Sequence, residues 1–236
     1  MKKTIWFWVC FVVAIVLATY FSTRIIMMRM GRGDAAVVHH ISVTTDANDV
    51  DLTGVKNMAE ILPNTKTYDI DLETMNTRIL GVPGVKYSAT RRLPNGNISV
   101  HTTMHNVLGI YAMGDGLYYP ISDDGFVVDR PSTECPDGAI LFRGAKPENI
   151  TKITTAVSAL TPIIDYLELI EQRRWNLYTK NGIKVLLPED IATTAEYEPN
   201  NAIAQLIKMN ETNKILSRDI TVIDLRDSRR VLIQDK

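Results

Sequence analysis

One uninterrupted apolar segment near the N-terminus limits what this chain can be. Residues 5–22 read IWFWVCFVVAIVLATYFS and carry no formal charge. An α-helix needs about 20 apolar residues to cross the ~30 Å hydrocarbon core of a bilayer, so the segment is just long enough. Trp6 and Trp8 at one end and Tyr20 at the other suit the two membrane interfaces. The sequence therefore predicts a transmembrane helix with its juxtamembrane turn over residues 5–28, after a short tail of residues 1–4.

The alternative for this segment is a cleaved signal peptide. Against it, the apolar run is longer than the usual core of a signal peptide, and no clear small-x-small cleavage site follows. Charge gives little help with orientation, because Lys2 and Lys3 precede the segment and Arg24, Arg29 and Arg32 follow it. Since a tail of four residues is easily left in the cytoplasm, we expect the N-terminus inside and the rest of the chain exported.

The composition of the whole chain excludes several classes of protein. Lys plus Arg is 26 and Asp plus Glu is 27, so the formal net charge of −1 argues against a generally basic nucleic-acid binder. Hydrophobic residues at 45% and charged residues at 22% are typical of a globular protein and exclude a disordered chain. Cys10 and Cys135 are too few for a disulfide framework or a cysteine-based zinc site. The exported part must therefore fold through burial and strand pairing.

The pattern after residue 36 predicts two small α+β domains. The first has the order strand, helix, helix, strand, strand, expected over residues 37–43, 51–62, 69–80, 85–91 and 98–103. Between its last two strands lies the pair Asn95-Gly96, which is a strong signal for a β-hairpin. This part of the chain should fold locally, since each element pairs or packs with a neighbour in the sequence.

The second domain should be a mixed β-sheet with helices packed on it. Strands are expected at residues 108–113, 117–121, 126–128, 140–142, 166–172, 175–179, 183–187, 220–226 and 231–234. One helix should begin at Asn149 and another at Asn200 or Asn201, because asparagine can cap a helix. We expect Trp175, a large aromatic residue at the start of a strand, to pack between the sheet and a helix.

No catalytic or metal-binding motif stands out. The sequence lacks G-x-S-x-G, P-loop, G-x-G-x-x-G and H-E-x-x-H patterns. His101 and His105 lie on or beside a strand, where four residues span ~13 Å, so they cannot share one metal ion and should be surface residues. Asp123 and Asp124 are expected to form a turn and not an acid pair. We therefore expect no catalytic residue, no metal ligand and no cofactor.

Three features, in order along the chain, carry a family resemblance. The first is a short tail, one anchor and the strand-helix-helix-strand-strand order. The second comprises residues 82–85 and 89–95, Ile98, Val100 and residues 118–127, and the third, the most specific, comprises residues 173–177, 181–188 and 216–226. Together they resemble the bacterial cell division family FtsQ/DivIB, especially its alphaproteobacterial members. Gly84, Met104, Val107 and Tyr111 depart from the family pattern.

This resemblance implies a POTRA domain at residues 37–106 and a β domain at residues 107–236. It implies a single-pass divisome scaffold of the bacterial inner membrane, located at the division septum, with its bulk in the periplasm. The partners it implies are the FtsB–FtsL pair of single-pass proteins, bound by β-strand addition to the last strand, and other divisome proteins through the POTRA domain. It implies neither a nucleic acid nor a cofactor.

The resemblance also assigns a partner-binding surface. Its residues are Arg173, Arg174, Arg226, Asp227, Ser228, Val231, Leu232, Ile233 and Gln234. Residues 231–234 would be the recognition edge, because a last strand pairs on one side only. One alternating pair of this strand, Val231 with Ile233 or Leu232 with Gln234, should pack on the core side. The arginines would hold an acidic partner segment, since a guanidinium can grip a carboxylate through two parallel hydrogen bonds.

Alternatives stay open at each of these points. The chain end or a loop could cover the edge, and Arg226 could pair with Asp224 or remain solvated. The protein could also be a membrane-anchored envelope enzyme with an unrecognised active site. A third possibility is another POTRA-containing assembly protein, although such proteins carry a signal peptide and a barrel of alternating ~10-residue strands, a pattern not seen here.

Overall fold

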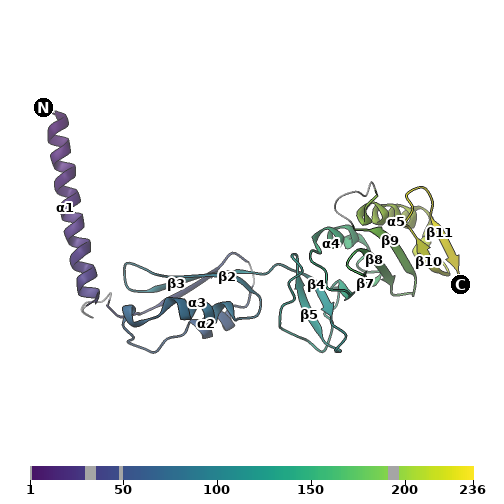
Figure 1. Ribbon diagram of the computed structural model, residues 1–236, viewed down its shortest axis with the longest axis horizontal. Coiled ribbons are helices and arrows are strands. Elements are labelled where there is room, and N and C mark those ends of the chain that lie inside the picture. The colour runs from purple at the N-terminus through teal and green to yellow at the C-terminus, as the bar shows by residue number, and fades with distance from the viewer. Residues whose placement is uncertain (1, 30–35, 48–49, 191–196) are drawn as a thin grey trace. The chain divides into compact units, whose positions relative to one another are not determined.

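The computed structural model describes residues 2–29, 36–47, 50–190 and 197–236 (Figure 1). Met1 of the predicted tail and Arg32 lie outside the described residues. The first element, α1 (Lys2–Arg29), contains the segment Trp6–Met27, which is long and apolar enough to cross a membrane. Its side chains from Trp6 to Met27 are all exposed, as expected for a helix that lipid would surround. It is the one such helix in the described part of the chain.

The chain divides into two compact units, Met1–Met104 and His105–Lys236. Beyond α1, the elements of the first unit are β1 (Ile41–Thr45), α2 (Thr53–Ala59), the 3₁₀ turn η2 (Thr67–Asp69), α3 (Leu72–Leu80), β2 (Val85–Arg92) and β3 (Ile98–Met104). The strands lie in the order β1-β3-β2, with β1 parallel and β2 antiparallel to β3. This β-α-α-β-β arrangement is the POTRA-type fold that the sequence predicted.

One face of this three-stranded sheet carries the core of the first unit. Val55 from α2 and Met75 and Ile79 from α3 pack on Ile98 and Val100 of β3. Residues on the opposite side of the strands are polar, among them Ser42, Thr44, Ser99, His101 and Thr103. The alternation along β1 and β3 is therefore that of a sheet with one buried face.

Several boundaries in the first unit differ from the prediction: the first helix is Thr53–Ala59 and not residues 51–62, and two elements start later because of specific contacts. The first strand begins at Ile41 and not at residue 37, because Val37 bridges Lys66 and the Val38 N–H donates to the Thr65 carbonyl. The second helix begins at Leu72 and not at residue 69. Asp71 caps it by accepting hydrogen bonds from two backbone N–H groups of its first turn. Both later starts come from contacts that a periodic pattern does not report.

The second unit is one mixed sheet of eight strands. Its elements are β4 (Val107–Ala112), β5 (Tyr118–Ser122), β6 (Leu141–Gly144), α4 (Thr151–Val157), η3 (Ser158–Leu160), β7 (Ile164–Ile170), β8 (Arg174–Thr179), β9 (Lys184–Glu189), α5 (Pro199–Asn213), η4 (Ile215–Ser217), β10 (Ile220–Asp224) and β11 (Leu232–Asp235). The strand order is β11-β10-β9-β8-β7-β6-β4-β5, with β4, β6 and β7 parallel to one another and β9 parallel to β10. Helices α4 and α5 cover one face of the sheet (Figure 1). The predicted α+β class is confirmed.

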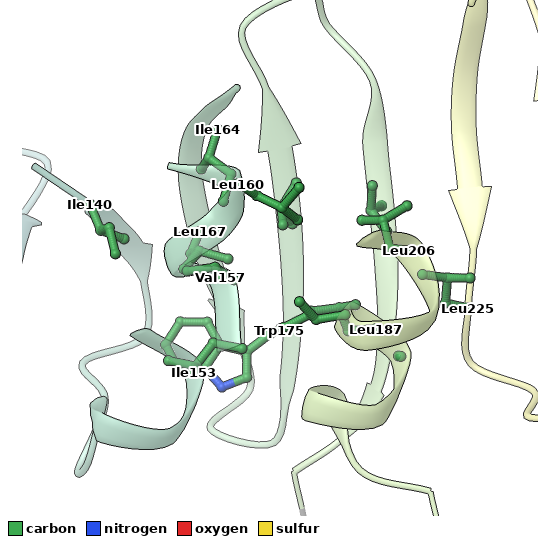
Figure 2. Packing of buried hydrophobic residues seen from close by; sticks show 14 of the residues in the cluster. Ile140, Ile153, Val157, Leu160, Ile164, Leu167, Trp175, Leu187, Leu206 and Leu225 are labelled. Carbon is green, nitrogen blue, oxygen red and sulfur yellow. The ribbon is translucent and has the colours of Figure 1, made fainter. Parts of the chain in front are cut away.

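Trp175 lies at the centre of this core. It points from β8 toward Ile153 and Val157 of α4, with Leu187 of β9 beside it (Figure 2). Its ring meets Phe142 edge-to-face at 5.7 Å, and its Nε1 donates to the Asp190 carboxylate at 3.3 Å. The position between sheet and helix that the sequence predicted is confirmed.

Three local predictions in the second unit were wrong. Residues 126–128 are not a strand and contribute only an isolated bridge between Val127 and Ile121, because Ser122 Oγ bonds both to the N–H and to the carbonyl of Phe126 and closes a tight turn. The cap of α5 is Glu198, followed by a proline whose missing N–H suits the first helical position. The N-cap of α4 is Ile150 and not Asn149, although the Asn149 side chain still accepts a hydrogen bond from the Thr151 N–H in the first turn.

Candidate partner-binding edge

Strand β11 lies at one edge of the eight-stranded sheet. It pairs antiparallel with β10, placing Leu232 opposite Asp224, Ile233 opposite Ile223 and Gln234 opposite Val222. Within the described residues β11 has no partner on its other side. All four of its residues are exposed, with Leu232 at 56% and Ile233 at 46%. Two large apolar side chains thus stand in solvent on opposite faces of an edge strand.

The expectation that an alternating pair of this strand packs on the core side was wrong. Val231, just before β11, packs partly against the core, but Ile233 on the same side is largely exposed. Leu232 and Gln234 on the other side are exposed too. The reason is that α5 packs on β9, two strands away, so the helix layer ends before the edge. Substitutions in β11 should therefore change the surface more than the core.

The backbone pairing of β10 determines which N–H and C=O groups of β11 can bond an added strand. The Leu225 N–H donates to the Leu186 carbonyl of β9 at 2.9 Å, so Ile223 and Leu225 direct their backbone groups toward β9. Because these groups alternate along a strand, those of Asp224 face β11 and pair with Leu232. It follows that the N–H and C=O of Ile233 point away from the sheet, toward any added strand.

The opposite edge of the same sheet is closed. The segment after β5 runs back along it, and Tyr118 and Ser132 exchange two backbone hydrogen bonds of 2.9 Å. Two more bonds join Val128 N–H to the Pro120 carbonyl and Ser122 N–H to the Phe126 carbonyl, each at 2.9 Å. Pro120 itself has no N–H to offer a new strand. In the described part of the sheet, β11 is the edge left uncovered.

Arg226 lies just past β10 and is held by Asp224. Its Nε donates to both carboxylate oxygens, at 2.9 and 3.1 Å, and its Nη2 bonds one of them as well. The hydrogen bonds from this guanidinium lower the pKa of Asp224 below its usual value. The internal pair that the sequence left as an alternative is therefore present in the protein without its partner. The Arg226 side chain is still half exposed, beside β11.

The two arginines before Trp175 lie in different surroundings. Arg174 shares a face of the sheet with Asp224, and its positive charge also contributes to lowering the pKa of that carboxyl. Its Nε is buried and has no hydrogen-bond partner in the described residues. Arg173 instead forms ion pairs with Glu171 and Glu189. The structure thus brings Arg174, but not Arg173, toward the carboxylate that holds Arg226.

Asp227 and Ser228 build the turn into β11. Asp227 accepts the Arg229 N–H at 2.9 Å, which lowers its pKa, and binds Arg230 Nε at 3.1 Å. Ser228 is exposed at the tip of the turn. Sequence reasoning had not assigned Arg230 to this group, although a charge three residues after an aspartate in a turn is a usable signal.

Asn176 is a second residue that sequence reasoning missed. It is buried on the face of β8 that carries Arg174, opposite Glu168, and its Oδ1 has no hydrogen-bond partner in the described residues. A buried amide oxygen without a partner is uncommon in folded proteins. No sequence pattern distinguishes it from an ordinary strand asparagine.

Two groups of polar side chains could be mistaken for catalytic sites. In one, the Ser122 hydroxyl donates to Asp124, while His105 Nδ1 lies 3.6 Å from the same carboxylate. In the other, Thr44 and Asp46 flank His101, but the Thr44 hydroxyl also donates to a backbone carbonyl. In neither group is a hydroxyl hydrogen-bonded to the histidine alone. Neither group therefore has the activated hydroxyl that nucleophilic catalysis requires.

His105 is not the surface residue that was expected. Its side chain is only 8% exposed and stacks on Phe126, with the ring centroids 4.1 Å apart and the planes nearly parallel. Asp123 and Asp124 form a turn, in which the Ile150 N–H donates to the Asp123 carbonyl and the Asp124 N–H to the Asp123 carboxylate. The turn role predicted for the two aspartates is confirmed. Within the described residues no cluster of side chains could hold a metal ion.

Comparison with known proteins gives one consistent set of relatives. A family model described as the C-terminal part of cell division protein FtsQ/DivIB matches residues 109–226, which contain Arg174 and Arg226 but not β11. Proteins named cell division protein FtsQ from Jannaschia sp. (strain CCS1) and Paracoccus denitrificans (strain Pd 1222) are 25% and 26% identical, over 71% and 77% of this chain and 53% and 52% of their own length. One from Rhizobium radiobacter is 26% identical over 72% of this chain and 80% of its own length. The chain thus spans about half the length of the first two relatives.

Proposed function

Because the chain belongs to the FtsQ/DivIB family of cell division proteins, we propose that it is a scaffold of the bacterial division machinery. It recruits the FtsB–FtsL pair by strand addition to β11. In this role it works through exposed backbone and side-chain surfaces, without catalysis. The family supports the division role, and the open edge supports the mode of binding.

The observation that carries this proposal is the contrast between the two edges of the sheet. Folded proteins normally cover, charge or interrupt an edge strand, because unpaired N–H and C=O groups invite pairing with another chain. Here β5 is sealed by backbone bonds to residues 126–132, whereas within the described residues β11 is left open and carries two exposed apolar side chains. An added strand would pair with Ile233 and bury the exposed side chains of Leu232 and Ile233.

Two arginines support an acidic partner segment: Arg226 follows β10 next to the edge, and Arg174 lies on β8, three strands from β11. Arg226 and, to a smaller extent, Arg174 lower the pKa of Asp224, and Glu189 stands opposite Arg174 across the β8–β9 pair. A carboxylate of the partner could bond Arg226, whose side chain is half exposed. Arg226 would then hold two carboxylates, one of its own chain and one of the partner.

The remaining parts of the chain have a consistent place in this proposal. Helix α1 anchors the protein in the inner membrane with its N-terminus in the cytoplasm, and the rest of the chain lies in the periplasm at the septum. Residues 37–106 act as a POTRA domain that is free to bind other divisome proteins, and residues 107–236 act as the β domain.

Backbone hydrogen exchange tests the proposed mode of binding. The full chain in detergent is incubated in heavy water with and without the cognate FtsB–FtsL pair, and exchange is followed by mass spectrometry. The peptide containing Ile233 should become protected on binding, whereas the peptide containing Tyr118 and Ser132 of the closed edge should not change. Binding without protection at Ile233 would show that the contact lies elsewhere.

A further inference from the structure

The first unit has an unpaired edge of its own, at β1. The Ile98 N–H donates to the His40 carbonyl, so His40 and the residues two and four positions after it direct their backbone groups toward β3. The backbone groups of Ile41, Val43 and Thr45 therefore point away from the sheet. Within the described residues β1 pairs with β3 alone. The open stretch is five residues long, with Val43 at its centre.

A groove of about 560 Å³ runs beside this edge. Its walls are β1 and the segment from α2 to Asn64, and half-buried Ile41 and Val43 line it on the strand side. Leu62 stands on the other wall with 80% of its side chain exposed. An edge strand flanked by exposed apolar surface is a place where another strand can add.

Lys56 and Glu60 give the groove one positive and one negative charge. A partner that presents the same two charges in the opposite order would therefore complement it. Lys56 and Glu60 lie four residues apart at the end of α2 and both line the groove. Neither forms an ion pair in the described residues. When two identical surfaces meet across a two-fold axis, each surface presents its residues to the other in opposite order. Lys56 of each copy then faces Glu60 of the other.

We propose that the groove beside β1 binds a second copy of this chain, by antiparallel pairing of the two β1 strands about Val43. Val43 pairs with Val43 of the second copy, and Ile41 pairs with Thr45 of the second copy. The two sheets join into one of six strands, and the Leu62 side chains close over the seam. This contact uses the first unit only, so it does not depend on the partner-binding role of β11.

Cysteine cross-linking tests the two-fold pairing. In a full chain with Cys10→Ala and Cys135→Ser, Val43→Cys should form a disulfide-linked dimer on mild oxidation, because directly opposed residues of antiparallel strands have Cα atoms ~5.5 Å apart. The matched control is Tyr87→Cys on β2, the opposite edge strand of the same sheet, which is 58% exposed. It should give several-fold less dimer. Equal dimer yields from both variants, or none from Val43→Cys, would overturn the proposal.

Charge reversal gives an independent test that leaves β1 intact. Lys56→Glu alone and Glu60→Lys alone should each lower the dimer fraction several-fold in sedimentation of the full chain in detergent, since like charges then face one another. The double variant Lys56→Glu/Glu60→Lys should restore the wild-type fraction, because the reciprocal pairs are re-formed with their signs exchanged. A protein that sediments as a monomer throughout, or single variants without effect, would contradict a second copy as the occupant. Cross-linking of Val43→Cys in cells to another protein alone would contradict it as well.

Discussion

The Leu225 backbone N–H donates to the Leu186 carbonyl at 2.9 Å, and this one bond determines how the edge of the sheet is presented. It directs Leu225 and Ile223 toward β9, and by alternation it directs Asp224 toward β11. Leu232 is therefore engaged with Asp224, whereas Ile233 offers its N–H and C=O outward. Leu232 thus pairs β11 with β10, whereas the backbone of Ile233 is available to pair with another chain.

The buried ring of Trp175 should be a main contribution to the stability of the second unit. Trp175→Ala should lower the free energy of unfolding by about 3–5 kcal/mol, since the substitution removes a large buried side chain and leaves a cavity. Chemical denaturation followed by far-UV circular dichroism measures the change. An unfolding curve like that of the wild type would mean that the ring does not pack as Figure 2 shows.

The pair of Asp224 and Arg226 should make stability depend on acid pH. Hydrogen bonds from Arg226 lower the pKa of Asp224 in the folded protein, so the pair's contribution is fully present above the unfolded pKa of about 4 and is lost as the pH falls through the folded pKa. Asp224→Asn should be less stable than the wild type at pH 7, and the difference should shrink below pH 4. Urea unfolding between pH 2 and pH 7 tests this, with Asp235→Asn on exposed β11 as the control. A difference that stays constant with pH would contradict the assignment.

Alanine substitutions at Gly125 and Gly116 can distinguish the cost of backbone strain from the cost of a steric clash. Both glycines have positive φ, +73° and +83°, so alanine is strained at either position by about 1 kcal/mol or more. A Cβ on Gly125 would in addition lie 2.2 Å from the Pro147 carbonyl oxygen, whereas nothing lies within 4 Å of one on Gly116. Gly125→Ala should therefore lower the thermal midpoint clearly more than Gly116→Ala. Equal midpoints would show that the turn at residues 123–125 does not pack against Pro147.

The first unit shows which parts of the fold follow from local pattern. Its strand-helix-helix-strand-strand order was predictable because the second helix has apolar residues at helical spacing and Asn95-Gly96 forms the last hairpin. The start of β1 was not, since Val38 bonds to a residue 27 positions away. Local periodicity thus predicts the elements, and long-range pairing sets their ends.

The candidate site, too, could be predicted from the sequence only in part. The last hairpin could be found from apolar alternation in the sequence, whereas the arginines at 174 and 226 were assigned only through the family resemblance. The exposure of Leu232 and Ile233 could not be found, since it depends on where α5 ends its cover of the sheet. The closed β5 edge could not be found either, because residues 126–132 pair with β5 without forming a regular strand.

Arg226 should contribute to partner binding through its charge and its shape. Arg226→Glu should weaken binding of the FtsB–FtsL pair at least about tenfold, which corresponds to roughly 1.4 kcal/mol, and should flatten its salt dependence. Arg226→Lys should recover only part of the affinity, because lysine cannot make the two parallel hydrogen bonds. Arg230→Glu, which alters the exposed turn, is the matched control and should bind more tightly than Arg226→Glu. Unchanged affinity and salt dependence in Arg226→Glu would remove this residue from the site.

The central claim is that a partner strand pairs with the outward backbone groups of β11, and affinity measurements on two variants of one residue test it most directly. Ile233→Ala shortens the side chain but keeps the N–H, whereas Ile233→Pro removes the N–H and fixes φ. Circular dichroism should show both variants folded, because the Ile233 N–H makes no bond within the sheet. The account predicts that the full chain with Ile233→Ala still binds the FtsB–FtsL pair, with moderately lower affinity, and that Ile233→Pro does not bind. A folded Ile233→Pro variant that binds the pair as tightly as Ile233→Ala would contradict strand addition at β11.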